Sequence, residues 1–548
     1  MTAVNIDKLF QAIKVGSIKK IVELLEEDPT LATKTDGANH TGIQRAVSAD
    51  NEALVKVLLD YGANPLSGIY PIREQTSPFA LSQILGFTGT ESIISDWIDQ
   101  DIGSSPMSRE LVTEVKRGRS DKVLLLLEAN PSIINTPDEH GQSALMRACQ
   151  LGNVSLVRNL IDWGADVNQT DPSGKDVLKH ALKRRSDDEH IVDGLSIGHI
   201  LVERGAKYDV WSAAALGDLQ MVQECLMRQR EGYSNADSFL REYINPLPIA
   251  AFYGRIQVVK LLIDQGQDLD ARFDMEVKDG WVEQFGLPIR YATEMDHFEI
   301  VKLLLESGAS AQTYQYAAGS AVSWANQAPN GKKIADYLFS KGATADFISY
   351  LLTDNRAAIA ERMAGSTVDT KGFLHNVALT GNLAYIDDLL ADSNEFDDEY
   401  WWAIITQVTR CWRVGNKRII NDHFNDFDYV IMLEKMLQRS SKANLKGNIF
   451  GESLLHRVVM CSKSANHVKK QMINVLLKYG VEVDGLDSEF KASPLSWAAM
   501  LGDDEIVKFL IDLGAKTDCP QNGCSPLAWA KRNNNRALVQ LLNRHRVN

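Results

Sequence analysis

The stretch GDDEIVKFLIDLG, which runs from Gly502 to Gly514, contains the pattern that decides the fold. Val507, Leu510 and Ile511 follow the i, i+3, i+4 spacing that places apolar side chains on one face of a helix. The second glycine supplies the left-handed backbone on which helices commonly end. The stretch therefore predicts a short amphipathic helix that stops at a glycine.

The same pattern recurs along the chain. Further copies run from Gly152 to Gly164 and from Gly254 to Gly266, and the frame also fits the segments before Gly62, Gly308 and Gly480. Gly480 and Gly514 are 34 residues apart, as are Gly308 and Gly342. This spacing leaves room for one more helix per unit. Because a lone pair of short helices cannot bury its apolar stripe, we expect the units to stack on one another.

Motifs on either side of this helix resemble those of the ankyrin-repeat family. The segments beginning at Ser493 and Ser525 resemble the consensus T-P-L-H-x-A, and the one beginning at Ser143 is a weaker copy. The segments 164–168 and 514–518 resemble the family's loop after the second helix. The resemblance covers nearly the whole chain, and it implies an all-α ankyrin-repeat solenoid of helix-turn-helix units with projecting finger loops.

The frame, followed through degenerate copies, predicts 16 candidate repeats. Their second helices are expected to end near Asp28, Gly62, Asp101, Asn130, Gly164, Gly205, Gln229, Gly266, Gly308, Gly342, Ser366, Ser393, Ser440, Gly480, Gly514 and His545. The copies that end near Ser366 and Ser440 depart most from the pattern, so we expect a kink or split near residues 343–430. Regularity divides the chain into an N-terminal array (1–342), an irregular region (343–448) and C-terminal repeats (449–548).

Composition limits the kinds of partner. The 548 residues carry 72 acidic and 58 basic side chains, for a formal net charge of -14. This charge repels nucleic acid and acidic membrane surfaces and favours proteins with basic or polar surfaces. No continuous basic stripe suggests RNA or DNA binding.

The sequence shows neither a signal-peptide pattern nor an apolar run long enough to span a membrane. Its six cysteines are sparse and irregularly spaced, which is not typical of a secreted disulfide framework. We expect a cytoplasmic protein, with secretion by a signal-independent route as the alternative. The oligomeric state stays open.

The longest interruption of the repeat, residues 394–428, is a candidate binding site. It contains Trp401, Trp402 and Trp412, with Asp397, Asp398 and Glu399 just before the first of them. Acidic side chains beside tryptophans suit a basic, partly apolar partner. The alternative is that the tryptophans fill an enlarged core and the acids are solvated or cap a helix.

A second interruption, residues 272–286, lengthens a loop of the type that projects as an ankyrin finger. Its candidate binding residues are Asp274, Glu276, Asp279, Trp281 and Phe285. A solvated hairpin is the alternative. Two further interruptions, 184–198 and 228–243, are expected to be solvated loops.

Motifs for catalysis, cofactors or metals are absent from the sequence. His456, Cys461 and His467 are residue types that ligate zinc, but His456 occupies the consensus histidine position, which the family uses for turn hydrogen bonds. We therefore expect no catalytic residue, no cofactor and no metal site.

The leading hypothesis is a protein-binding scaffold that recognises its partners through its concave face and finger loops. A narrower hypothesis is a microbial effector, or an inhibitor that neutralises a toxin or an enzyme by occlusion. The alternative from another class is an enzyme with a small catalytic insertion within 394–428, in which His423 is the candidate residue. That segment is short for most catalytic folds.

Overall fold

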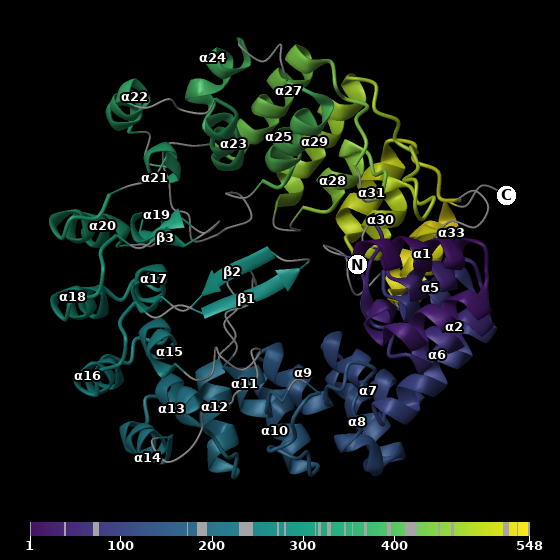
Figure 1. Cartoon of the computed structure of the whole chain (residues 1–548), viewed down its shortest axis with the longest axis horizontal. Coiled ribbons are helices and arrows are strands. Elements are labelled where there is room, and N and C mark those ends of the chain that lie inside the picture. The colour runs from purple at the N-terminus through teal and green to yellow at the C-terminus, as the bar shows by residue number, and fades with distance from the viewer. Residues whose placement is uncertain are drawn as a thin grey trace. The chain divides into compact units, whose positions relative to one another are not determined.

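A computed structural model shows the chain as a series of short helix pairs (Figure 1). It describes residues 2–37, 40–69, 76–172, 174–182, 194–229, 245–270, 273–278, 281–285, 287–312, 314–315, 319–325, 330–344, 347–352, 355–365, 370–391, 396–411, 425–447, 450–461, 465–518, 525–533 and 535–545. All structural statements below concern these residues.

Contacts divide the chain into two compact units. The first unit contains α1 (Thr2–Lys14), α2 (Ile18–Glu27), α3 (Gly42–Ser48), α4 (Glu52–Asp60), α5 (Pro78–Leu85) and α6 (Thr88–Asp101), and later in the chain α23 (Thr370–Thr380), α24 (Ile386–Ala391), α25 (Asp398–Thr409), α27 (Asp428–Ser440), α28 (Leu454–Val459), α29 (Asn466–Lys478), α30 (Pro494–Met500), α31 (Asp504–Asp512), α32 (Pro526–Arg532) and α33 (Arg536–Arg544). It also contains the 3-10 turns η1 (Pro29–Thr33) and η4 (Leu383–Tyr385).

The second unit contains the helices between these two parts. They are α7 (Pro106–Lys116), α8 (Ser120–Ala129), α9 (Ala144–Gln150), α10 (Val154–Asp162), α11 (Val177–Ala181), α12 (Gly194–Glu203), α13 (Val210–Leu216), α14 (Leu219–Gln229), α15 (Pro246–Phe252), α16 (Ile256–Asp264), α17 (Pro288–Glu294), α18 (Phe298–Glu306), α19 (Ala321–Ala325), α20 (Gly331–Ser340), α21 (Phe347–Leu352) and α22 (Arg356–Gly365), with the 3-10 turn η2 (Pro131–Asn135). Its strands are β1 (Phe273–Lys278), β2 (Trp281–Phe285), β3 (Tyr314–Gln315) and β4 (Gly319–Ser320), which form two antiparallel pairs.

The predicted all-α architecture of stacked helix pairs is confirmed, and the strands are confined to two short hairpins in loops. Each of the 16 predicted helix ends falls within two residues of an observed one. In the deciding stretch, Val507 and Leu510 of α31 are buried, Ile511 is half-buried, and Gly514 follows with φ of +90°. The apolar stripe and its terminating glycine therefore act as the spacing indicated.

The boundary between α22 and α23 lies within residues 343–430, where the sequence predicted a kink or split. The boundary between α6 and α7 was not predicted, because the repeat pattern continues across it without loss of register. The predicted division into 1–342, 343–448 and 449–548 follows the regularity of the repeat pattern and not the contacts between helices, so it stays a prediction.

An aspartate at the base of several finger loops ties the loop to the helix that follows. Asp138 Oδ1 accepts backbone N–H groups of its own loop, and Oδ2 lies 3.5 Å from Arg147 of α9. Nine residues also separate Asp171 from His180 and Asp36 from Arg45, and each of these pairs is in contact. This finger-base contact repeats because each unit places its loop and its first helix in the same geometry.

Candidate protein-binding surfaces

Helix α25 begins with the acidic residues that the sequence singled out. Asp397 caps the helix, because its Oδ1 accepts a hydrogen bond from the Tyr400 backbone N–H at 2.7 Å. Asp398 and Glu399 lie in the first turn, where the helix dipole favours carboxylates. All three are exposed, and Asp398 pairs with Lys442 at 2.5 Å. The start of α25 is thus an exposed acidic surface held in place by a helix cap.

Aromatic side chains pack beside these carboxylates. The Phe396 ring lies edge-on to Tyr400 at 4.6 Å and to Trp401 at 5.5 Å between ring centres. The Tyr400 hydroxyl donates to the Lys371 carbonyl oxygen at 2.6 Å, and Lys371 Nζ lies 5.1 Å from the centre of the Tyr400 ring. Phe396, Tyr400 and Lys371 were missed in the sequence, since their part in this surface depends on contacts between α23 and α25.

The two adjacent tryptophans have different environments. Trp401 is only 3% exposed and belongs to the same buried face of α25 as Ile404, Ile405 and Val408. Trp402 is half-buried, so part of its side chain remains accessible. Trp401 therefore fills the core, as the alternative interpretation of these residues held. Trp412 and His423 lie outside the described residues.

The other predicted binding loop forms the β1–β2 hairpin, drawn in teal in Figure 1. In its register Phe273 pairs with Phe285, Asp274 with Gln284, Glu276 with Val282 and Lys278 with Trp281. The hairpin precedes α17, which begins at Pro288. Four of the five candidate residues thus lie in one strand pair, and Asp279 lies outside the described residues.

A polar series in the second unit was not among the predicted residues. Gln150 of α9 donates from Nε2 to Gln142 Oε1 at 3.0 Å and lies 2.7 Å from His180 Nδ1 of α11. His180 Nε2 in turn lies 3.0 Å from Asp171 Oδ2. These contacts fix the polar side chains of two successive first helices. The nine-residue spacing from Asp171 to His180 is the sequence signal that could have revealed them.

The histidine considered as a zinc ligand is part of the fold. His456 lies in the core, where its Nδ1 contacts Ser453 and its Nε2 lies 3.1 Å from the Ala492 carbonyl oxygen. Burial lowers its pKa to about 3, so the ring is neutral at physiological pH. His467 instead lies 3.0 Å from Asp426 at the surface. In the described part of the chain, no group of three or more His, Cys, Asp or Glu side chains could hold a metal ion.

The segment proposed for a catalytic insertion contains α25 and the start of α27. The buried face of α25 supplies the apolar side chains of Trp401, Ile404, Ile405 and Val408 to the core. Elsewhere among the described helices, none is long and apolar enough to cross a membrane.

A family model agrees with the repeat architecture. The family model described as ankyrin repeats matches residues 111–209, 210–315 and 455–548, which together make up just over half of the chain. The solved human ASB11 ankyrin repeat domain is 20% identical, covers 44% of this chain and 100% of its own, and aligns with a TM-score of 0.25.

Three curated relatives match part of the chain. Ankyrin repeat and SAM domain-containing protein 6 of Danio rerio is 30% identical over 164 residues, which cover 30% of this chain and 22% of that protein. A putative ankyrin repeat protein of Acanthamoeba polyphaga mimivirus is 24% identical over 184 residues, with coverage of 32% and 22%. The B-cell lymphoma 3 protein homolog of Mus musculus is 25% identical over 177 residues, with coverage of 31% and 38%. The chain therefore spans well under half of each relative's length, but its repeats, confirmed by the family match, show that it belongs to the ankyrin-repeat family.

Proposed function

We propose that this chain is a protein-binding scaffold and that the acidic start of α25 is one of its recognition surfaces. Ankyrin repeats generally serve as scaffolds for protein–protein interaction, which gives the broad function. The observation that supports the surface is the cluster of exposed Asp397, Asp398 and Glu399 beside half-buried Tyr400 and Trp402. Charge at the rim of an apolar contact selects partners of opposite charge.

The partner that fits this surface is a protein with a basic, partly apolar segment. Lysine or arginine side chains would meet the carboxylates, and an apolar or aromatic side chain would pack against the edge of Trp402. The hairpin β1–β2 is a second proposed contact, through the residues predicted from its sequence. The roles of effector and of inhibitor stay hypotheses that the identity of the partner decides.

The test compares proteins recovered by affinity purification and quantitative mass spectrometry. The variant combines Asp398→Asn, Glu399→Gln and Trp402→Ala and leaves the Asp397 cap and the buried Trp401 in place. The control combines Glu26→Gln and Glu27→Gln, two exposed acids at the end of α2. Circular dichroism verifies that both variants are folded.

We expect a partner that the parent and the control recover equally and that the variant recovers at least about tenfold less, the change for roughly 1.4 kcal/mol of binding energy. Equal recovery by all three proteins would place the binding site elsewhere, and substitutions in the hairpin would be the next test. Absence of any specific partner would contradict the scaffold function itself.

A further inference from the structure

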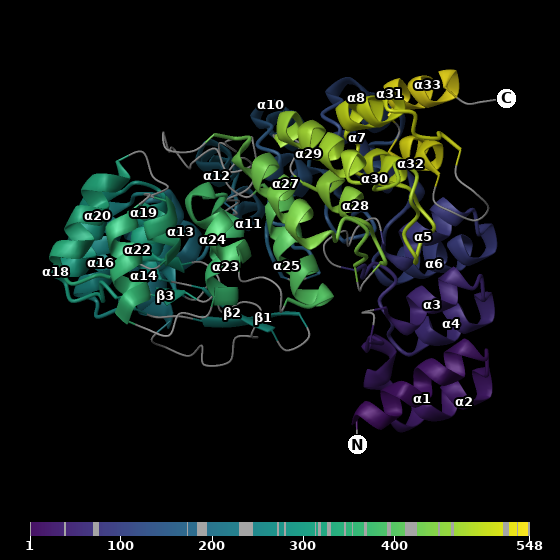
Figure 2. The ribbon, with the colours of Figure 1, turned by 90° about the horizontal axis from the view of Figure 1, so that it is seen from above.

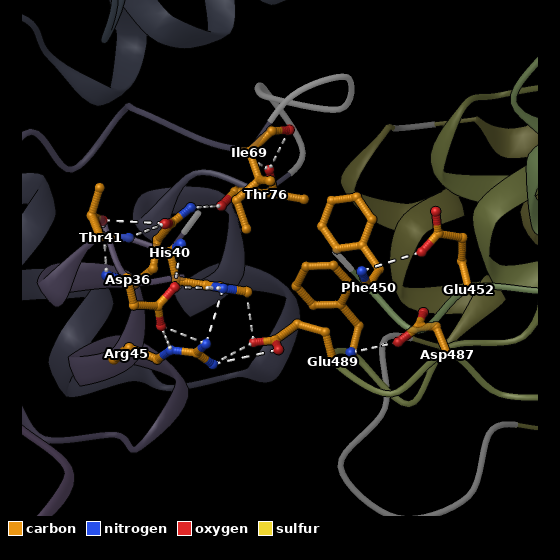
Figure 3. A network of polar contacts seen from close by, with 12 residues as sticks. Asp36, His40, Thr41, Arg45, Ile69, Thr76, Phe450, Glu452, Asp487 and Glu489 are labelled. Atoms are coloured by element: carbon orange, nitrogen blue, oxygen red, sulfur yellow. Dashed lines mark hydrogen bonds and ion pairs between the residues drawn. The ribbon is translucent and has the colours of Figure 1, made fainter. Parts of the chain in front are cut away.

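Within the first unit, α3 and the segment just before it contact the loop before α30 (Figure 3). Arg45 of α3 places Nη1 3.1 Å from Glu489 Oε1. His40, which is 2% exposed, places Nε2 3.0 Å from the same oxygen. Glu489 belongs to the loop before α30 and lies 444 residues after Arg45. One carboxylate therefore connects segments from opposite ends of the chain.

The Glu489 carboxylate is charged at neutral pH. Burial by itself would raise its pKa, but the neighbouring His40 and Arg45 hold the pKa below its ordinary value. Hydrogen bonds to an ionised group are stronger than hydrogen bonds between neutral groups. The contact of Glu489 with His40 and Arg45 therefore holds the two segments together more strongly than neutral side chains would. Arg532 of α32 adds a second contact, since its Nε donates to Gln83 Oε1 of α5 at 3.2 Å.

Apolar side chains pack between these polar contacts. Leu81 of α5 lines a space of about 10 Å³ together with Trp497 of α30 and Trp529 of α32, which is room for one water molecule at most. All three side chains are buried. In Figure 2, α1 to α6 lie in successive pairs that lead to α32. A repeat at the end of a stack needs a neighbour to cover its apolar face, and α5 packs against α32 in this way.

Each side of this contact has polar interactions of its own. Arg45 donates from Nε and Nη2 to Asp36 Oδ2 at 3.0 and 2.8 Å, independently of Glu489. On the other side, Asp487 accepts hydrogen bonds from Trp497 Nε1 and the Phe490 backbone N–H. Separation of the two segments would therefore leave the Arg45 network and the Asp487 loop intact. The hydrogen bonds within each side are thus separate from those that join the two sides.

We propose that α1 to α6 form an intramolecular latch that closes over the first helices of the last two repeats, α30 and α32. First helices and finger loops are the elements that the ankyrin resemblance implies for partner binding. The closed latch thus occupies, with residues of the same chain, a surface suited to another protein. This inference concerns the accessibility of α30 and α32 and does not depend on the proposed surface at α25.

Hydrogen–deuterium exchange of the full chain tests the latch with the variant Glu489→Gln. Glu482→Gln is the matched control, since Glu482 is an exposed carboxylate between α29 and α30. We expect peptides of α3, α5, α30 and α32 to exchange together, about tenfold faster in Glu489→Gln than in the parent, because a charge-assisted contact is lost. Peptides of α23 and α25 should not change. Unchanged exchange in this variant, or faster exchange throughout the first unit, would overturn the proposal.

Cross-linking tests whether the closed state exists independently of that variant. Gln83→Cys combined with Arg532→Cys, treated with a short bismaleimide, should give a cross-linked peptide that joins these two positions. The Gln83→Cys single variant controls for reaction with the native cysteines. Once formed, the cross-link should restore parental exchange to α5 and α32 in a Glu489→Gln background. Absence of the cross-link would show that the latch is not closed in solution.

Discussion

Replacement of Lys469 by methionine should strongly destabilise the C-terminal repeats. Lys469 Nζ of α29 lies 2.8 Å from Asp503 Oδ2, and the two side chains are only 1% and 3% exposed. Methionine fills similar space but leaves the Asp503 carboxylate buried without its cation. Removal of one partner from a buried ion pair costs about 3–5 kcal/mol, because the remaining charge has lost both water and its counter-ion.

A second substitution separates this electrostatic cost from lost packing. Asp503 Oδ1 accepts hydrogen bonds from the Ile506 backbone N–H and from Asn466 Nδ2, and an asparagine at position 503 can keep both. Lys469→Met combined with Asp503→Asn should therefore recover most of the stability lost in the single variant. A double variant that is more stable than the sum of the two single losses predicts would show that Lys469 and Asp503 interact directly.

The neighbouring Lys470 provides the matched control. It pairs with Glu505 at 2.5 Å, but its side chain is 31% exposed and that of Glu505 is 56% exposed. Lys470→Met should cost no more than about 1 kcal/mol, the range of surface ion pairs. Native-state hydrogen exchange over α28 to α31 measures these differences in opening free energy locally. A loss below about 1 kcal/mol for Lys469→Met, or equal losses in the single and double variants, would refute the reasoning.

Two further predictions concern α25 and the loop before α30. Trp401→Ala should lower stability by about 3–5 kcal/mol, whereas Trp402→Ala should cost clearly less, because only Trp401 is buried. Thermal unfolding followed by circular dichroism measures both losses. Equal losses would contradict the assignment of Trp401 alone to the core. Burial raises the pKa of Asp487 to about 6, so its ionisation lowers the stability of the parent by up to about 3 kcal/mol as the pH rises from about 4 to 6. Asp487→Asn has no such ionisation, so its melting temperature relative to that of the parent should increase over this range. A difference that does not change with pH would show that the pKa of Asp487 is not raised in the folded protein.

The helices were predictable because short-range rules position them. Glycine placement and the apolar triplets determine where α10, α16 and α31 begin and end, and these signals lie within one repeat. The unit boundary before α7 gave no such signal, since the frame passes through it unchanged. Contacts between distant segments, such as Arg45 with Glu489, depend on the summed geometry of many repeats.

The candidate site was predictable only in part. Asp397, Asp398 and Glu399 stood out by their charge, and the structure places them at the start of a helix, exposed. Adjacent tryptophans in a sequence do not reveal which of the two faces the core, because that depends on how α25 packs against its neighbours. Lys371 and Phe396 join the surface through three-dimensional contacts that no local pattern encodes.

The pairing of Arg45 with Glu489 also constrains the order of events during synthesis. The ribosome makes α1 to α6 before it makes α30 and α32, which lie several hundred residues later in the chain. Leu81 of α5 therefore lacks its neighbours Trp497 and Trp529 until α30 and α32 have been made. Contacts that span so long a sequence form slowly, and apolar surface exposed meanwhile invites association with other chains. The contact between Arg45 and Glu489 therefore forms only after the loop before α30 has been made, and a chain truncated before Glu489 lacks it.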